Sequence, residues 1–153
     1  MGTVEAAAER VIAATPERIY GLIADYREGR PKVLPESFVD YRVEQGGLGA
    51  GTVVTYTLHA ARRQRPYRLE VTEPQPGRVL HEVDTTSSFT QDWTVEPAEG
   101  GARVRIACSW RGAGGIGGFF ERTFAPKGVS RLYEQLLDGI QRECAGGRSA
   151  PGP

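Results

Sequence analysis

The sequence has no long apolar run and no leader-like start. No segment approaches the roughly 18 consecutive apolar residues that a transmembrane helix needs. The first residues, MGTVEA, carry neither the basic region nor the apolar stretch of a secretory signal. These absences predict a cytoplasmic protein without a stable membrane anchor.

Residues that carry metal or nucleophilic chemistry are also scarce. Two cysteines and two histidines lie far apart in the chain, so we expect no metal site and no cofactor. Cys108 and Cys144 do not imply a disulfide in a reducing compartment. The chain contains no Ser-His-Asp arrangement, no Walker loop and no H-E-x-x-H motif. The sequence therefore offers no catalytic signature.

An excess of charge of either sign is missing as well. Nineteen lysines and arginines balance nineteen aspartates and glutamates in a chain of 153 residues. This balance argues against a nucleic-acid-binding protein, which would carry a basic surface. The length suits one domain with one hydrophobic core.

One long amphipathic helix is predicted over residues 129–144. Its apolar residues recur at the spacing of a single helical face. They are Val129, Leu132, Tyr133, Leu136, Leu137 and Ile140. Most of the chain before this helix has the alternation of strands, so the helix is expected to cover a sheet.

The remaining elements follow a simple order. Residues 6–14 predict a first strand, and Thr15 and Pro16 then supply the cap and first position of a helix. A short irregular helical turn is expected after Tyr26. Six further strands are predicted at residues 38–44, 52–59, 67–72, 79–84, 89–95 and 103–111.

This order predicts an α+β fold of the helix-grip type. A curved, seven-stranded antiparallel sheet would wrap around the long C-terminal helix, with two short helices between the first two strands. Residues 1–145 would form a single domain. The small, Pro/Gly-rich segment 146–153 is expected to be a disordered tail.

The sequence also resembles a known superfamily. The resemblance rests on the opening RVIAATPERIY of residues 10–20, the TVEP hairpin of residues 94–97 before two glycines, and the apolar C-terminal helix. Over residues 4–145 the chain resembles the START/Bet v 1-like superfamily, the SRPBCC or polyketide cyclase/dehydrase and lipid transport proteins. The resemblance implies an internal cavity for a hydrophobic or amphipathic ligand, such as a lipid, polyketide or aromatic metabolite. It implies, as the alternative, an enzyme of the cyclase, aromatase or dehydratase kind.

The strand alternation and the helix face predict which residues line that cavity. They are Tyr56, Leu58, Tyr67, Leu69, His81, Gln91, Trp93, Ile106, Cys108, Trp110, Phe120, Phe124, Leu132 and Leu136. Gln91 is the most informative of them, because a buried amide needs hydrogen-bond partners and a ligand could supply one. A neighbouring strand or a water molecule could equally satisfy it.

The strand at residues 79–84 has two possible registers. One turns its two valines and His81 inward, and the other turns Leu80, Glu82 and Asp84 inward. We favour the first, because two valines outweigh one leucine. His81 would then be a candidate general acid or base. The second register would place an acidic pair in the cavity and make an enzyme more plausible.

A glycine-rich stretch at residues 112–117 precedes the last helix. It fits G-x-G-x-x-G, but no second strand follows to build a dinucleotide site. We interpret it instead as a mobile lip of the cavity. Phe119, Phe120 and Phe124 then belong to the core or to a ligand entrance, and a break in the helix is expected at Pro126 and Gly128.

One predicted hairpin, residues 62–68, is strongly basic. The cationic residues at and beside it are His59, Arg62, Arg63, Arg65 and Arg68. They predict a solvated turn whose charges protect a sheet edge. The alternative is a docking surface for an anionic head group or an acidic carrier protein.

Overall fold

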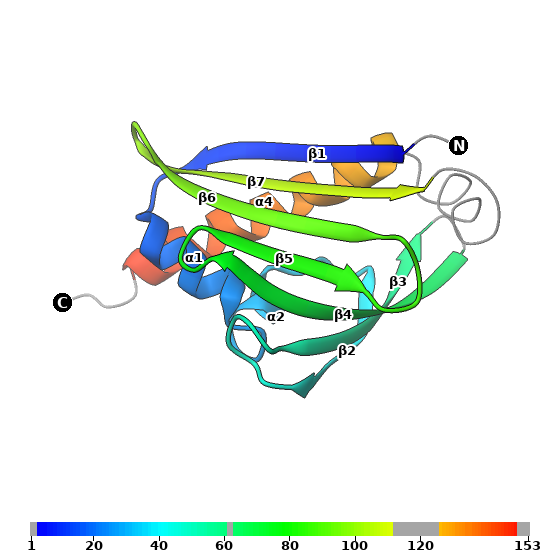
Figure 1. Ribbon diagram of the computed structural model, residues 1–153. Coiled ribbons are helices and arrows are strands. Elements are labelled where there is room, and N and C mark those ends of the chain that lie inside the picture. Colours follow the sequence, from blue (N-terminus) through cyan, green and yellow to red (C-terminus); the bar gives the residue numbers. More distant parts are fainter. Residues whose placement is uncertain (1–2, 61–62, 112–125, 150–153) are drawn as a thin grey trace.

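A computed structural model describes residues 3–60, 63–111 and 126–149. The elements are β1 (Thr3–Ile12), α1 (Pro16–Ala24), α2 (Arg30–Val33), β2 (Phe38–Gln45), β3 (Val53–Ala60), β4 (Arg63–Gln75), β5 (Val79–Asp84), β6 (Thr90–Ala98), β7 (Gly101–Arg111) and α4 (Pro126–Ser149). The strands form one antiparallel sheet in the order β1-β7-β6-β5-β4-β3-β2 (Figure 1). This arrangement confirms the predicted helix-grip fold.

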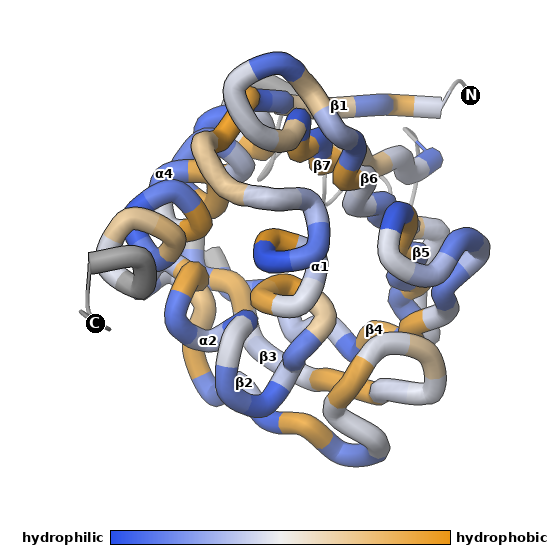
Figure 2. The backbone as a smooth tube through the Cα atoms, turned by 90° about the vertical axis from the view of Figure 1, so that its left-hand side faces the viewer, coloured by the Kyte–Doolittle hydropathy of each residue, from blue (hydrophilic) through white to orange (hydrophobic). Residues whose placement is uncertain are grey.

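The sheet curls around its own concave side, and the helices close the space that it encloses. Seen end-on, the strands follow an arc from β1 to β2, while α4 spans the open side of the arc (Figure 2). Helix α1 lies across the near end, beside α2. The curvature and these helices position the hydrophobic core inside the arc.

The start of α1 is set by local sequence, as predicted. The Thr15 hydroxyl accepts a hydrogen bond from the Arg18 amide at 3.1 Å, and Pro16 occupies the first helical position. Ile19 and Ile23, one turn apart, are fully buried. The cap therefore fixes where the chain turns from the sheet to cover one end of the core.

The first strand begins earlier than its apolar centre suggested. It pairs with β7 without interruption from Thr3, opposite Arg111, to Ile12, opposite Ala102. The prediction placed it at residues 6–14. Pairing with a long neighbour extends the strand at its start, and a turn at Ala14 ends it sooner.

Helix α4 is longer than the predicted segment at both ends. Pro126 is its first residue, which suits proline at a helix start, and Gly128 lies inside the helix instead of breaking it. The helix continues to Ser149, into the segment expected to be a tail. Residues 150–153 and the expected lip at 112–117 lie outside the described residues.

Two contacts hold α4 in place. Arg10 on β1 donates hydrogen bonds to Glu134 and Asp138 at 2.7 Å and to Gln141 at 2.9 Å. On the other side α4 packs against α2, where Gly139 lies directly against the backbone of Val33. The helix is thus tied to the β1 edge and to α2.

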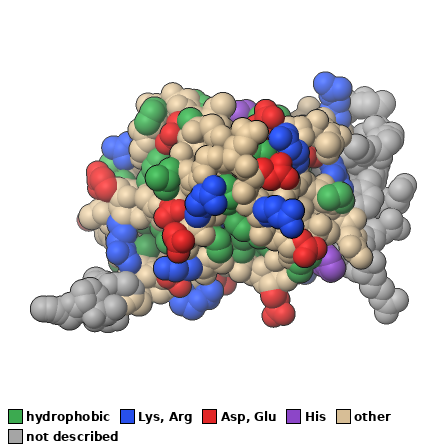
Figure 3. Space-filling view, turned by 90° about the horizontal axis from the view of Figure 1, so that it is seen from below, with side chains coloured by type: hydrophobic (Ala, Val, Ile, Leu, Met, Phe, Trp, Pro, Cys, Tyr) green, Lys and Arg blue, Asp and Glu red, His purple; other side chains and the backbone are tan. Residues whose placement is uncertain are grey.

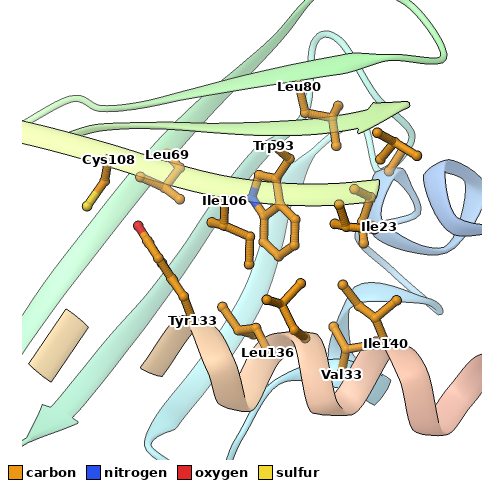
Figure 4. Close-up of a cluster of buried hydrophobic side chains, with 14 of the residues drawn as sticks. Ile23, Val33, Leu69, Leu80, Trp93, Ile106, Cys108, Tyr133, Leu136 and Ile140 are labelled. Carbon is orange, nitrogen blue, oxygen red and sulfur yellow. The ribbon is translucent and has the colours of Figure 1, made fainter. Parts of the chain in front are cut away.

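The core fills the space between the concave face and α4. Leu80, Trp93 and Ile106 point inward from the sheet toward Tyr133 and Leu136 of the helix (Figure 4). Cys108 and Cys144 are buried and unbridged. On the face seen from below in Figure 1, acidic and basic side chains intermingle with apolar ones between them (Figure 3). Within the described part of the chain, no helix is long and apolar enough to cross a membrane.

The favoured register of β5 was wrong. Leu80, Glu82 and Asp84 are buried, whereas the two valines and the intervening histidine are only half-buried. Glu82 is paired with Val71 on β4 and with Gln91 on β6, both of which face the core. Counting apolar residues failed because each buried carboxylate has its own arginine partner in the interior.

Candidate functional site

A pocket lies between the concave face of the sheet, α2 and α4. The predicted lining residues that face it are Tyr56, Leu58, Tyr67, Leu69, Gln91, Trp93, Trp110, Leu132 and Leu136. The prediction missed Arg30, Leu34, Phe38, Tyr41, Val54, Phe89, Val129 and Tyr133. Ile106 and Cys108 are buried in the core without lining the pocket, and Phe120 and Phe124 lie outside the described residues.

The pocket is narrow. The space open to the centre of a water molecule is about 40 Å³, and a single water needs about 10–15 Å³ by this measure. Its half-buried lining residues are Leu34, Phe38, Tyr41 and Leu132, whereas the others described are buried. These four therefore mark the side facing solvent, between α2, β2 and α4.

A row of aromatic rings crosses the pocket wall. Phe38 lies 4.9 Å from Tyr56 between ring centroids, and Tyr56 lies 5.2 Å from Tyr67 in a stacked pair. Tyr67 and Phe89 form a T-shaped pair with centroids 5.2 Å apart, and the Phe89 centroid lies 6.5 Å from that of Trp110. All five rings line the pocket. Such a wall offers an apolar, polarisable surface to an aromatic molecule.

The polar end of the pocket is organised by the buried carboxylate of Glu82. Its Oε1 accepts hydrogen bonds from Gln91 Nε2 at 2.6 Å and Trp93 Nε1 at 3.1 Å. Its Oε2 accepts one from Arg30 Nη2 at 2.9 Å and one from the Tyr26 hydroxyl. Four donors saturate both oxygens, which makes the burial of this charge possible.

The Arg30 guanidinium completes the pair and borders the pocket. Its carbon lies 4.4 Å from the ring centroids of both Tyr26 and Trp93, and Nε donates to the Ile23 carbonyl at 3.0 Å. Burial is the largest single effect and disfavours its charge, but Glu82, together with Tyr26 and Tyr41, raises the Arg30 pKa above its usual value. The pocket thus contains a permanent, compensated cation.

The hydroxyl groups of the pocket are neutral hydrogen-bonding groups. Tyr133 donates to Gln91 Oε1 at 2.6 Å and so extends the network from the sheet to α4. Burial raises the pKa of Tyr56 and of Tyr133 well above the usual value. Burial also raises the pKa of the nearby Cys108 thiol to about 11. These groups are unsuited to act as nucleophiles or bases near neutral pH.

A second buried carboxylate, Asp84, is satisfied in the same way. It accepts hydrogen bonds from Arg65 Nη2 at 2.9 Å and from the Arg68 amide at 3.0 Å. The hydroxyl of Ser87 donates at 2.6 Å, and that of Thr86 lies at 3.2 Å. Asp84 is therefore a structural anchor for the turn after β5.

His81 does not reach the pocket. It lies on the outer face of the sheet, where Nδ1 is 2.6 Å from Asp92 Oδ1 on β6. Both side chains are substantially exposed, at 34% and 47%. The placement of His81 in the cavity was wrong, because the register of β5 is the opposite one.

Nearby carboxylates neutralise part of the positive charge of the basic hairpin. Arg65 is buried against Asp84, and Arg68 forms ion pairs with Glu44 and Glu70, each at 3.3 Å. Arg62 and the side chain of Arg63 lie outside the described residues. In the described ranges, no group of three or more His, Cys, Asp or Glu could hold a metal ion.

Contacts between distant segments explain why Arg30, Leu34 and Tyr133 were missed. Arg30 and Leu34 fall within the irregular helical turn that was predicted after Tyr26, and this turn folds under the sheet as α2. The available signal was electrostatic. Glu82 and Asp84 lie on the same face of their strand as Leu80, so that face must either meet solvent or be supplied with two buried cations. Tyr133 was assigned to the buried helix face, but its reach to Gln91 depends on the separation of α4 and β6.

Comparisons with known proteins agree with this architecture. The sequence profile of the polyketide cyclase / dehydrase and lipid transport family matches residues 3–145. A search of curated proteins returned no match. Among solved structures, the KanY protein (ms6282) is 39% identical, with a TM-score of 0.84 and coverage of 95% of this chain and 100% of that one.

More distant structures show the fold alone. The protein TTHA0849 from Thermus thermophilus is 22% identical, with a TM-score of 0.76 and coverage of 95% and 99%. Major latex-like protein 151 from Panax ginseng is 10% identical, with a TM-score of 0.72 and coverage of 92% and 97%. On the profile match over nearly the whole folded chain, this protein belongs to the polyketide cyclase/dehydrase and lipid transport family.

Proposed function

We propose that the protein binds a small, largely apolar ligand in the pocket between sheet and α4. The observation that carries this proposal is the composition of the wall, which combines a row of aromatic rings with residues of a hydrogen-bonded polar network. Small-molecule sites combine a mainly apolar lining with a few placed polar groups. Apolar burial contributes about 2.5 kcal/mol per 100 Å² of ligand surface removed from water.

Binding requires the pocket to widen. Room for a few waters is far below the roughly 300–1,000 Å³ of a drug-sized site. The half-buried side chains Leu34, Phe38, Tyr41 and Leu132 face solvent and can rotate with less loss of packing than the buried ones. We therefore assign ligand entry to the gap between α2, β2 and the first turns of α4.

A cyclase or aromatase activity is the second candidate. It is favoured by Arg30, a permanent cation that borders the pocket and could stabilise an enolate oxygen of a polyketone chain. Against it, both carboxylate oxygens of Glu82 are occupied by donors, so the pocket offers no free base among its described residues. Ligand binding without proton transfer is simpler, because Glu82 and its hydrogen-bond donors can keep the partners that they have in this structure.

Tryptophan fluorescence tests the proposal directly, because the only two tryptophans, Trp93 and Trp110, both line the pocket. Titration with compounds extracted from the denatured protein, or with polyaromatic and fatty alcohol probes, should change the emission saturably. Val129→Phe should weaken binding about tenfold or more. The larger side chain occupies space that the ligand needs, and the closely packed lining residues cannot move aside to restore it.

The matched control is Val11→Phe, the same substitution at a position 41% exposed on β1. It should leave the titration unchanged. Equal weakening in both variants, or no saturable change with any probe in the parent protein, would contradict a binding pocket at this place. Turnover of a poly-β-keto substrate that is lost on Arg30→Lys would instead support the cyclase.

A further inference from the structure

The buried charges at and near the pocket form arginine–carboxylate ion pairs, and this pairing affects which charge a ligand can carry. We propose that the pocket accepts uncharged aromatic compounds and rejects ionised acids such as fatty-acid carboxylates. This inference rests on the proposed binding function and narrows its ligand class. It would distinguish a neutral aromatic metabolite from an anionic lipid.

Each buried arginine that the structure describes at or near the pocket is already paired with an anion. The Arg30 and Glu82 side chains are 5% and 0% exposed and lie 2.9 Å apart. Arg65 and Asp84, at 8% and 0% exposed, also lie 2.9 Å apart. The interior is thus neutral overall, with no surplus positive charge among the described residues for a carboxylate or phosphate to pair with.

An anionic ligand that approached a buried arginine would also approach the carboxylate already paired with it. To bind Arg30 closely, a ligand carboxylate must approach Glu82, which lies on the same guanidinium. Like charges in a low-dielectric interior repel strongly, and an uncompensated buried carboxylate loses several kcal/mol of hydration. A neutral ligand avoids both effects.

The lining favours a flat ligand with one neutral polar group. Tyr56 stacks on Tyr67 with 25° between the rings, and the Phe38 ring is tilted by 53° from the Tyr56 ring. The Tyr56 side chain is buried, faces the pocket, and makes no side-chain hydrogen bond with another described residue. Its hydroxyl can therefore donate to, or accept from, an amide, ketone or phenol group on the ligand.

The test compares ligands that differ in charge but hardly in shape. Isothermal titration calorimetry near neutral pH would measure 2-naphthamide against 2-naphthoate, and decan-1-ol against decanoate. We expect 2-naphthamide to bind about tenfold or more tightly than 2-naphthoate, because only the latter is desolvated as an ion. We also expect 2-naphthamide to bind more tightly than decan-1-ol.

A lysine at the pocket mouth should reverse the preference. Leu132→Lys adds an unpaired cation at a half-buried lining position of α4 and should make 2-naphthoate the tighter ligand. Gln135→Lys, on the exposed side of the same helix, is the control and should keep the parent preference. Because both positions have some exposure, neither variant leaves a charge fully buried.

The outcomes separate this inference from the binding function. Equal or tighter binding of 2-naphthoate in the parent protein overturns the charge selectivity and leaves the binding function standing. Preferential binding of decan-1-ol or decanoate over 2-naphthamide overturns the aromatic preference alone. Failure of all four probes and of the extracted compounds overturns both proposals. An unchanged preference in Leu132→Lys also contradicts the inference.

Discussion

At the scale of single residues, Glu82 has the greatest influence on the interior. It links β5 to α2 through Arg30 and to β6 through Gln91, and Tyr133 extends this network to α4. A buried ion pair is weak evidence for net stability, because desolvation offsets much of the attraction. Its members are nevertheless hard to change singly, because the partner is left charged and alone.

We therefore expect Glu82→Gln to lower the free energy of unfolding by about 3–5 kcal/mol, because it leaves Arg30 as an uncompensated buried charge. The control is Asp92→Asn, which makes the same acid-to-amide change in the exposed pair with His81. That change should lower the free energy of unfolding by less than about 1 kcal/mol. Urea unfolding followed by circular dichroism measures both, and similar losses would show that burial of the pair is not the deciding factor.

At the scale of elements, the placement of α4 depends on a close approach to α2. A methyl group built on Gly139 would lie 2.5 Å from the Val33 carbonyl oxygen and 2.9 Å from its Cα. These are backbone atoms, which cannot rotate away. Gly139 therefore sets the distance between the two helices that border the entry side of the pocket.

We predict that Gly139→Ala destabilises the protein by about 1–3 kcal/mol, although alanine favours helix, because α4 must move away from α2. Gly128→Ala is the matched control, since a methyl group there meets no atom of the described residues within 4 Å. It should be neutral or stabilise by up to about 1 kcal/mol. Thermal unfolding of the two variants checks the pair of predictions, and stabilisation by both would argue against tight α2–α4 packing.

At the scale of the whole molecule, all six tyrosines share an unusual titration behaviour. Burial raises the pKa of every one of them above the usual value near 10. In the unfolded chain the same phenols ionise near their usual pKa. The folded state therefore retains protons that the unfolded state releases, and stability declines as the pH rises above about 10.

The expected signature is a cooperative alkaline transition. Each phenol that ionises only on unfolding lowers the free energy of unfolding by about 1.4 kcal/mol per pH unit above its unfolded pKa. Tyrosinate absorbance should therefore stay low past pH 10 and then rise in one step that coincides with loss of circular dichroism. A gradual rise centred near 10, with the fold intact, would show that the rings are accessible.

Much of the fold followed from the sequence, and the reasons are local. Thr15 caps the start of α1 and Pro16 suits its first position, so the side chains themselves indicate where the helix begins. The helical spacing of residues such as Leu136 and Ile140 indicates which face of α4 is buried. Alternation placed Tyr56, Tyr67 and Trp93 on the inner face of the sheet. Each of these inferences needs only near neighbours in the chain.

Only the tertiary structure decided which side chains from distant segments come into contact. Whether Glu82 or His81 enters the core depends on Arg30, which arrives from α2 fifty-two residues earlier. Local hydrophobicity favoured the wrong register because the energy of a buried charge is set by partners that a strand pattern does not contain. The sequence by itself determined a helix-grip fold with an aromatic inner face. Only the tertiary structure brought Arg30 of α2 to Glu82 of β5, and this pair leaves the polar centre without net charge.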